Sequence, residues 1–462
     1  MKIRVAVVGD GVAPALVSAV LARAGAAVIR VPTGDGGTGL GPFGPAVLAL
    51  PDFVASELAG SLGAVRGASF ALGIAFAGWA PGGAAWFLPF GDIGAPLGTV
   101  AFAHVVGRLR AAGHAMRLAD FAMATQAAHA GRFAPPSPDP RSPLSTLAMG
   151  LHYPADALAA ALDRLAPAAR TTPLADVTVA DGRIAGLTLA DGQTIDAHLY
   201  VEATGEAARL IGALGDDWQS WAAMLPCDRA RVTVASEPLA PPPYALHAAD
   251  RGGWTATVPL DGRRVETRFA AGGDGAAYEN GCRPSPWLGN CVAVGAAAGV
   301  VEPLLGAPLL LALRQAERLA GLLPHAADHR VEAGEYNRLT LAELECARDA
   351  LGALWATNGR VGEPLWDGVR DRASERLQWT LDLYRSRGRV PTYDGDLLSR
   401  GDWAAVLDGQ GLRPRRLDPL ASALGDDAVL AHAERLRDRL LATVRQMPSH
   451  ADQLARYRAA AA

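Results

Sequence analysis

The chain has 462 residues, of which 50% are hydrophobic and 19% are charged, and its formal net charge is -4. These values are typical of a globular protein and exclude a basic nucleic-acid-binding domain. Its four cysteines lie far apart without a C-x-x-C pair, so the sequence predicts neither a zinc site nor disulfides, and we expect reduced thiols in the cytoplasm. No apolar run reaches the roughly 20 residues of a membrane span, and we expect no contact with a membrane.

The first predicted unit is a strand, a turn, a helix and a second strand. A β-branched run over residues 3–8 stops at Gly9-Asp10-Gly11, and the glycines also interrupt what would otherwise mimic a secretory signal. Apolar residues recur at helical spacing over 13–24, and 27–31 predicts the next strand. This order is typical of a dinucleotide-binding unit, in which glycines let the backbone approach a pyrophosphate at a helix N-terminus.

The remaining elements are predicted from turn signals and periodicity. Asp181-Gly182 and Asp191-Gly192 each lie between β-prone segments and predict two hairpins. The other predicted elements are loops at 33–45 and 135–143, helices at 155–165 and 308–322, strands at 199–205 and 290–295, and a mostly helical, amphipathic region from residue 336 onward. We therefore predict a mixed α/β module over residues 1–330 and a helical module over 331–462.

Six short blocks carry the motif signal. They are Leu225-Pro226-Cys227-Asp228-Arg229, Trp287 with 290–295, Glu302-Pro303-Leu304, Tyr336-Asn337-Arg338, the segment 385–389, and Met447-Pro448-Ser449-His450. In this order the blocks resemble those of the flavin-dependent tryptophan halogenases. The resemblance implies an α/β fold, with a Rossmann-like FAD-binding module of the aromatic-hydroxylase type and mixed sheets, joined to a mainly helical C-terminal module that covers an indole site.

The resemblance also implies a chemistry and a set of partners. Halogenases of this family receive reduced FAD from a separate flavin reductase, react it with oxygen, and send hypohalous acid through a tunnel to the substrate. The expected partners are thus an aromatic small molecule, a flavin reductase and a second copy of the chain in a homodimer.

Two residues that the family uses for halogen transfer are replaced. The family's lysine follows an aromatic residue, and here Ala71 follows Phe70 at that position. An alanine methyl group carries no charge and cannot form a haloamine. The only lysine in the chain is Lys2, which we expect to lie far from the tunnel because it precedes the first strand. The family's glutamate is replaced by Leu305, so no catalytic residue is predicted.

Further departures surround this position. Pro308 replaces a glycine where backbone N–H groups hold the halide in the family, and proline has no N–H group. Glu302 is a candidate substitute base, although we predict a structural role in which it satisfies backbone groups at a turn. The family's W-x-W-x-I-P signature runs here from Trp254 to Pro259 with Ala256 at the second tryptophan, and this loss is expected to open the site.

The predicted FAD site is only partly preserved. Pro14 occupies the third position of G-x-G-x-x-G, and Pro32 stands where an acid would bind the ribose, which leaves a shifted Asp35 as a substitute. The residues predicted to contact FAD are Gly9, Gly11, Val12, Ala13, Gly39, Gly41, Ala203, Gly205, Gly295 and Leu304. The glycines are equally explained by the needs of the fold. His104, His152 and His450 lack a carboxylate at a telling spacing, and we interpret them as core or solvated histidines.

Three functional hypotheses follow. The first is a flavoprotein that has changed from halogenation to monooxygenase or other oxidoreductase chemistry on an aromatic or other apolar small molecule. The second is a non-catalytic binding or partner protein, and the third is a true halogenase.

Overall fold

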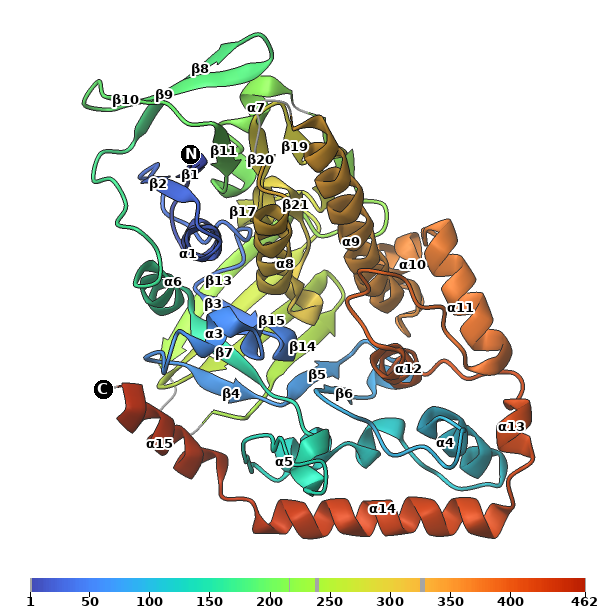
Figure 1. The fold of residues 1–462 in the computed structure, drawn as a ribbon. Helices are drawn as coiled ribbons and strands as arrows, with labels where there is room; N and C mark the ends of the chain where they lie inside the picture. The colour runs from blue at the N-terminus through green and yellow to red at the C-terminus, as the bar shows by residue number, and fades with distance from the viewer. Residues whose placement is uncertain (1, 216, 237–240, 325–328, 462) are drawn as a thin grey trace.

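The computed structural model describes residues 2–215, 217–236, 241–324 and 329–461. Its first unit is the predicted one and consists of β1 (Arg4–Val8), α1 (Val12–Arg23) and β2 (Ala27–Val31). A five-stranded sheet of order β19-β20-β11-β1-β2 adds β11 (Leu199–Glu202), β19 (Trp287–Leu288) and β20 (Cys291–Ala293). All neighbours in this sheet are parallel except β19 and β20, so the turn after β1 lies beside the ends of β11 and β20 (Figure 1).

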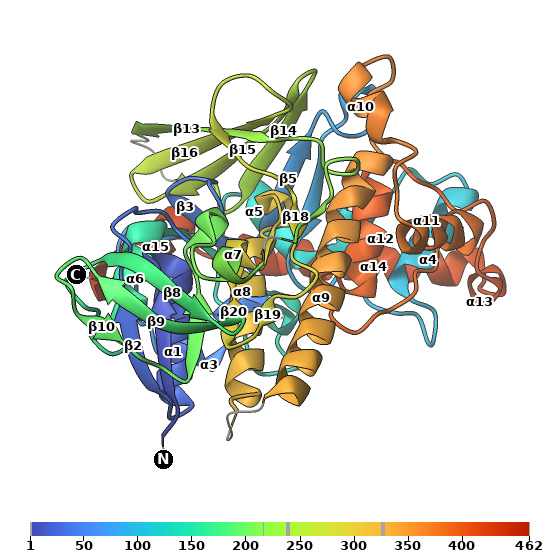
Figure 2. The ribbon, with the colours of Figure 1, turned by 90° about the horizontal axis from the view of Figure 1, so that it is seen from above.

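A second sheet of seven strands is largely antiparallel and has the order β17-β13-β16-β15-β14-β5-β6. Its members are β5 (Gly73–Ala77), β6 (Trp86–Pro89), β13 (Arg229–Ser236), β14 (Ala245–Asp250), β15 (Gly253–Leu260), β16 (Arg263–Ala270) and β17 (Ala276–Ala277). Only β14 and β5 pair in parallel. Figure 2 shows this sheet on one side of the molecule and the parallel sheet on the other. The sequence analysis did not predict these strands.

Three small sheets complete the β structure. Their members are β3 (Ala46–Ala49), β7 (Gly150–Pro154) and β4 (Ser69–Ala71); β10 (Thr194–Ile195), β9 (Arg183–Leu189) and β8 (Leu174–Ala180); and β12 (Gln219–Ser220), β18 (Gly281–Cys282) and β21 (Gly299–Val300). The small sheet of β8, β9 and β10 contains both predicted hairpins. Asp181 has φ 50° and Gly182 has φ 68°, the left-handed pair that an Asp-Gly hairpin turn requires.

The helices gather mainly in the second half of the chain. They are α2 (Pro51–Val54), α3 (Glu57–Gly60), α4 (Phe102–Ala111), α5 (Met123–His129), α6 (Ala155–Asp163), α7 (Ile211–Leu214), α8 (Ala307–Gly321), α9 (Arg330–Ala356), α10 (Pro364–Val369), α11 (Glu375–Arg387), α12 (Arg400–Gly409), α13 (Pro419–Ser422), α14 (Asp426–Gln446) and α15 (His450–Ala461). The predicted mixed α/β fold with a helical C-terminal region is therefore confirmed. Within the described residues, no helix combines the length and apolarity needed to cross a membrane.

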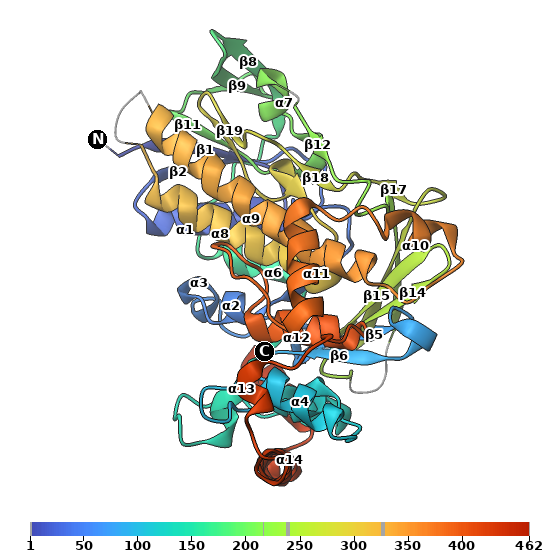
Figure 3. The same cartoon turned by 90° about the vertical axis from the view of Figure 1, so that its right-hand side faces the viewer.

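Helices from both halves of the chain share one layer. The long C-terminal helix α14 packs against α4 and α5, and Figure 3 looks along its axis. The neighbouring α8 and α9 also pack together, and the predicted module boundary after residue 330 falls at the first residue of α9. That division remains a prediction.

Candidate functional site

The turn between β1 and α1 is the first candidate site. Gly9 has φ 137° and Gly11 has φ 87°, conformations that L side chains rarely adopt. A Cβ atom on Gly9 would lie 2.5 Å from the carbonyl oxygen of Ala203, and one on Gly11 would overlap the carbonyl oxygen of Gly37. The two glycines are therefore required by close approach of the chain's own backbone.

Residues 37–41, which we call the cradle loop, fill the space in front of this turn. The carbonyl oxygen of Thr38 accepts a hydrogen bond of 2.9 Å from the N–H of Ala13, the second residue of α1. The carbonyl oxygen of Gly39 accepts one of 2.9 Å from the N–H of Ala296, in the 3-10 helix Gly295–Ala297. Since a pyrophosphate at a helix N-terminus needs such N–H groups, it does not fit in this arrangement.

The ribose side of the site is also altered. Pro32 directly follows β2, at the position where the resemblance implies a ribose-binding acid. Its side chain has no hydrogen-bond acceptor. The carboxylate of Asp35, the substitute acid suggested by the sequence, forms an ion pair of 2.5 Å with Arg209. Asp10 accepts hydrogen bonds from the Thr33 hydroxyl at 2.7 Å and from the backbone N–H of Gly34 at 2.8 Å. These carboxylates hold the chain's own loop in place.

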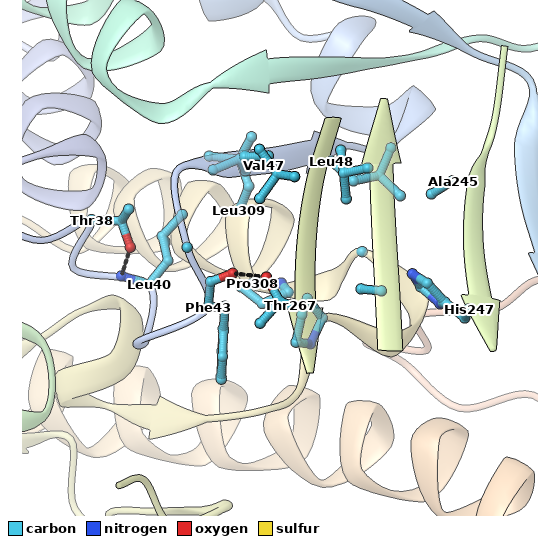
Figure 4. A pocket seen from close by; sticks show the side chains of 17 residues that line it. Thr38, Leu40, Phe43, Val47, Leu48, Ala245, His247, Thr267, Pro308 and Leu309 are labelled. Atoms are coloured by element: carbon cyan, nitrogen blue, oxygen red, sulfur yellow. Dashed lines mark hydrogen bonds between the residues drawn. The ribbon is translucent and has the colours of Figure 1, made fainter. Parts of the chain in front are cut away.

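Next to the cradle loop lies an apolar cavity, which we call the Phe43 cavity. Figure 4 shows Phe43, Thr267, Pro308 and His247 around it, with the Thr267 hydroxyl donating to the carbonyl oxygen of Phe43 at 2.9 Å. Ala256, at the position of the signature's second tryptophan, lines this cavity. His247 was not predicted, since nothing adjacent in the sequence marks it. Burial lowers the pKa of His247 to about 3, so the ring is neutral.

Glu302 lies in the core beside this cavity. Its carboxylate, which is 0% exposed, accepts hydrogen bonds from the Trp254 indole at 2.8 Å, the Asn280 amide at 2.8 Å and the Tyr278 hydroxyl at 3.3 Å. Burial raises the pKa of Glu302 to about 7, although these three donors act in the opposite direction. Every donor to this carboxylate is a buried side chain and not a backbone group at a turn, so the structural contacts of Glu302 differ from those predicted.

The two replaced family positions, Ala71 and Leu305, are both buried. Ala71 is 0% exposed and pairs with Gly150 across β4 and β7. A Cβ atom on Gly150 would lie 3.0 Å from the Phe90 ring and 3.5 Å from Ala71 Cβ. Leu305 and Phe90 line one further cavity, which we call the Phe90 cavity. Ala71 is not among the residues that line this cavity, and neither Ala71 nor Leu305 carries a charged or polar side chain.

Three carboxylates stand around the Phe90 cavity, contributed by Asp52, Asp92 and Asp402. The pKa of Asp402 is raised, first by burial and then by the like charges of Asp52 and Asp92, against hydrogen bonds from Ser399. Asp52 is partly neutralised by Arg314 at 3.1 Å. This group of carboxylates was not predicted from the sequence, because its members come from three separate segments.

The remaining predicted tunnel residues lie in the core. The Phe70 ring stacks on Phe133 at 4.0 Å, and Phe70 lines neither cavity in the described chain. The carbonyl oxygen of Pro259 accepts a hydrogen bond of 2.6 Å from Ser69, and Leu304 is 0% exposed. Lys2 is exposed and lies two residues before the start of β1.

The three predicted histidines have different surroundings. His152 is fully buried, and desolvation lowers its pKa to about 3. Burial also lowers the pKa of His450. The pKa of His104 is lowered by partial burial, with Asp418 opposing and Arg389 reinforcing the effect. The fold thus supplies His104 with a carboxylate neighbour that sequence spacing could not indicate.

Comparisons with known proteins agree with the fold. A family model described as tryptophan halogenase matches residues 4–269 and 264–426. The tryptophan 6-halogenase SttH of Streptomyces toxytricini is 28% identical over 300 residues, which are 56% of this chain and 56% of that protein. The tryptophan 7-halogenase RebH of Lentzea aerocolonigenes is 23% identical over 284 residues, or 52% and 54%. The sequence match therefore spans about half the length of these curated relatives.

Similarity to solved structures extends further along the chain. The flavin-dependent halogenase BrvH from Brevundimonas sp. BAL3 has a TM-score of 0.89 and 26% identity, with 99% of each chain covered. A flavin-dependent halogenase from Xanthomonas campestris has a TM-score of 0.89 and 27% identity, again with 99% of each chain covered. The family model covers well over half of the sequence, and the protein belongs to the tryptophan halogenase family.

Proposed function

We propose that this protein binds an aromatic small molecule in the Phe90 cavity and does not transfer halogen to it. The observation that carries the proposal is the pair Ala71 and Leu305, which places two hydrocarbon side chains where the family resemblance implies an ammonium group and a carboxylate. Neither can hold an oxidised halogen or accept a proton from a cationic ring.

No other side chain supplies the missing ammonium group. Lys2 is exposed just before β1, and the described residues that line the Phe90 cavity include neither lysine nor arginine. An arginine would not serve in any case, because its guanidinium stays protonated and is not a nucleophile near neutral pH. Halogen transfer through a haloamine therefore has no donor in this cavity.

The rim of the cavity narrows the class of ligand. Asp52, Asp92 and Asp402 place negative charge around an apolar floor that includes Phe90 and Leu305. A ligand that carries a carboxylate, such as tryptophan, would meet like charge, whereas a neutral or cationic aromatic compound would not. We expect indole and tryptamine to bind more tightly than tryptophan.

The test combines binding with turnover. The purified protein is incubated with FAD, a flavin reductase, NADH, and chloride or bromide, and indole, tryptamine and tryptophan are each supplied as substrates. We expect calorimetric binding of tryptamine and no halogenated product by mass spectrometry. A halide-dependent haloindole would refute the proposal and support the true halogenase.

A second candidate is flavin-dependent oxygenation that requires no halide, with a separate flavin reductase as partner. Family membership implies an FAD site, and Ala256 widens the Phe43 cavity where the family's signature has a tryptophan. Product formation in the same assay without halide, together with FAD-dependent oxygen consumption, would favour this candidate over simple binding. The cytoplasmic location expected from the sequence is part of the proposal, and the free state of all four cysteines supports it.

A further inference from the structure

The cradle loop occupies the place of an anion with its own carbonyl oxygens. Thr38 and Gly39 are consecutive, yet their carbonyl oxygens accept hydrogen bonds from two separate elements, the N-terminus of α1 and the 3-10 helix that begins at Gly295. A Cβ atom on Gly295 would overlap the carbonyl oxygen of Gly39. The space that small residues such as Gly295 would leave for a phosphate is therefore occupied by this loop.

We propose that the cradle loop is an internal ligand of the dinucleotide site, so that FAD binds only to those molecules in which the loop has left the cradle. A carbonyl oxygen and a phosphate oxygen cannot accept from the same N–H group in the same space. Occupation by the loop and occupation by the pyrophosphate of FAD are mutually exclusive.

The N-terminus of α1 has few donors to spare. Its N–H at Ala13 is taken by Thr38, Pro14 has no N–H, and the N–H of Ala15 points to the carbonyl oxygen of Gly11 at 3.4 Å. Helix N-termini bind phosphate through these first N–H groups. While the loop is closed, the first turn thus lacks the donor set that a pyrophosphate needs.

Hydrogen bonds before the loop and within it stabilise the closed conformation. Asp10 holds Thr33 and Gly34 before it, and within it the Thr38 hydroxyl accepts from the N–H of Leu40 at 3.2 Å and donates to the carbonyl oxygen of Gly41 at 3.3 Å. The apparent affinity of a ligand that binds only the open form is its intrinsic affinity multiplied by the fraction of open molecules. The closed loop therefore lowers the apparent affinity for FAD.

Two glycines of this segment offer a matched test. Gly39 has φ 70° and Gly36 has φ 71°, so alanine strains the backbone equally at either position. A Cβ atom on Gly39 would lie 2.7 Å from Ala13 Cβ and 2.9 Å from the Ala203 carbonyl oxygen, whereas nothing lies within 4 Å of one on Gly36. Gly39→Ala should therefore expel the loop from the cradle, and Gly36→Ala should leave it in place.

The experiment measures the FAD dissociation constant of the wild-type protein and both variants by fluorescence titration. We expect binding at least about tenfold tighter in Gly39→Ala and within about twofold of wild type in Gly36→Ala, as for a closed-to-open ratio near ten. Equal affinity in all three proteins, or tighter binding by the wild type, would overturn the proposal. The result does not depend on whether the protein halogenates.

A second measurement needs no cofactor. Hydrogen exchange of the Ala13 and Ala296 amides should be slow in the wild-type protein and faster in Gly39→Ala, because their acceptors leave. Thr38→Ala, which removes the hydroxyl that shapes the loop, should act in the same direction without adding a side chain near the cradle. Fast exchange of both amides in the wild-type protein would contradict a closed loop.

Discussion

The dinucleotide turn and the Phe90 cavity have diverged from the family's expected pattern in opposite ways. At the turn, Gly9 and Gly11 are kept, and the chain's own loop occupies the space they create. Around Phe90, Leu305 lines the cavity and Ala71 is buried, so hydrocarbon side chains stand where the family resemblance implies charged ones. The first region keeps these two glycines and has its opening filled, while the second lacks the charged groups that the resemblance implies.

The difference follows from what each residue contributes to stability. Glycine at a positive φ against a neighbouring backbone stabilises the fold whether or not a cofactor binds. A buried ammonium or carboxylate costs free energy unless it is paired, so a chain that does not use its chemistry gains by replacing it. We therefore expect a charged side chain to be poorly tolerated at the buried position 71, in contrast to the carboxylates at the rim of the Phe90 cavity.

Restoring the lysine tests this most strongly. Ala71→Lys should lower the free energy of unfolding by about 3–5 kcal/mol, because residue 71 is fully buried and the carboxylate at position 305 is absent. Ala71→Met, of similar length and uncharged, should cost only about 1–3 kcal/mol through overpacking. Urea unfolding of both variants separates charge from size, and equal stabilities would break the comparison.

Glu302 provides a second test, because it is a buried carboxylate that accepts hydrogen bonds from three side chains. Its folded-state pKa of about 7 lies above the ordinary 4.5, so the folded protein retains a proton that the unfolded chain releases in this range. The stability it contributes is therefore present below about pH 4.5 and is lost as the pH rises through about 7. Since one pKa unit corresponds to about 1.4 kcal/mol, the loss is about 3 kcal/mol.

Glu302→Gln should remove this part of the pH dependence. Urea unfolding at pH 5 and pH 8 measures it, and the variant should lose less stability between them than the wild-type protein. Some dependence should remain, because burial also raises the pKa of Glu206 to about 7. Identical pH profiles for both proteins would show that Glu302 is charged throughout this range.

The smallest expected effect concerns the rim. Asp92→Asn should strengthen tryptophan binding about twofold and leave indole binding unchanged, because an exposed charge contributes little. Calorimetric titration of both ligands measures the ratio, and Asp156→Asn, on a carboxylate outside the rim, is the control. An equal change for indole would show that Asp92 acts by packing and not by charge.

The sequence predicted the local elements well where turn chemistry or periodicity determines them. The β1–α1–β2 unit, both Asp-Gly hairpins and the helix at 308–322 correspond to observed elements. The seven-stranded sheet was not predicted, because its pairing of β14 with β5 joins segments about 170 residues apart in the numbering. Local patterns contain no information on such pairing.

Side-chain chemistry at single positions was decided by sequence alone. With alanine at residue 71 and Lys2 as its only lysine, the chain has no ammonium group at that position in the sequence. The state of the cradle was decided only by tertiary structure. Thr38 and Gly39 reach Ala13 and Ala296 because parallel strands bring their ends to one edge of the sheet, and backbone carbonyl groups, which every residue carries, leave no signature in a sequence.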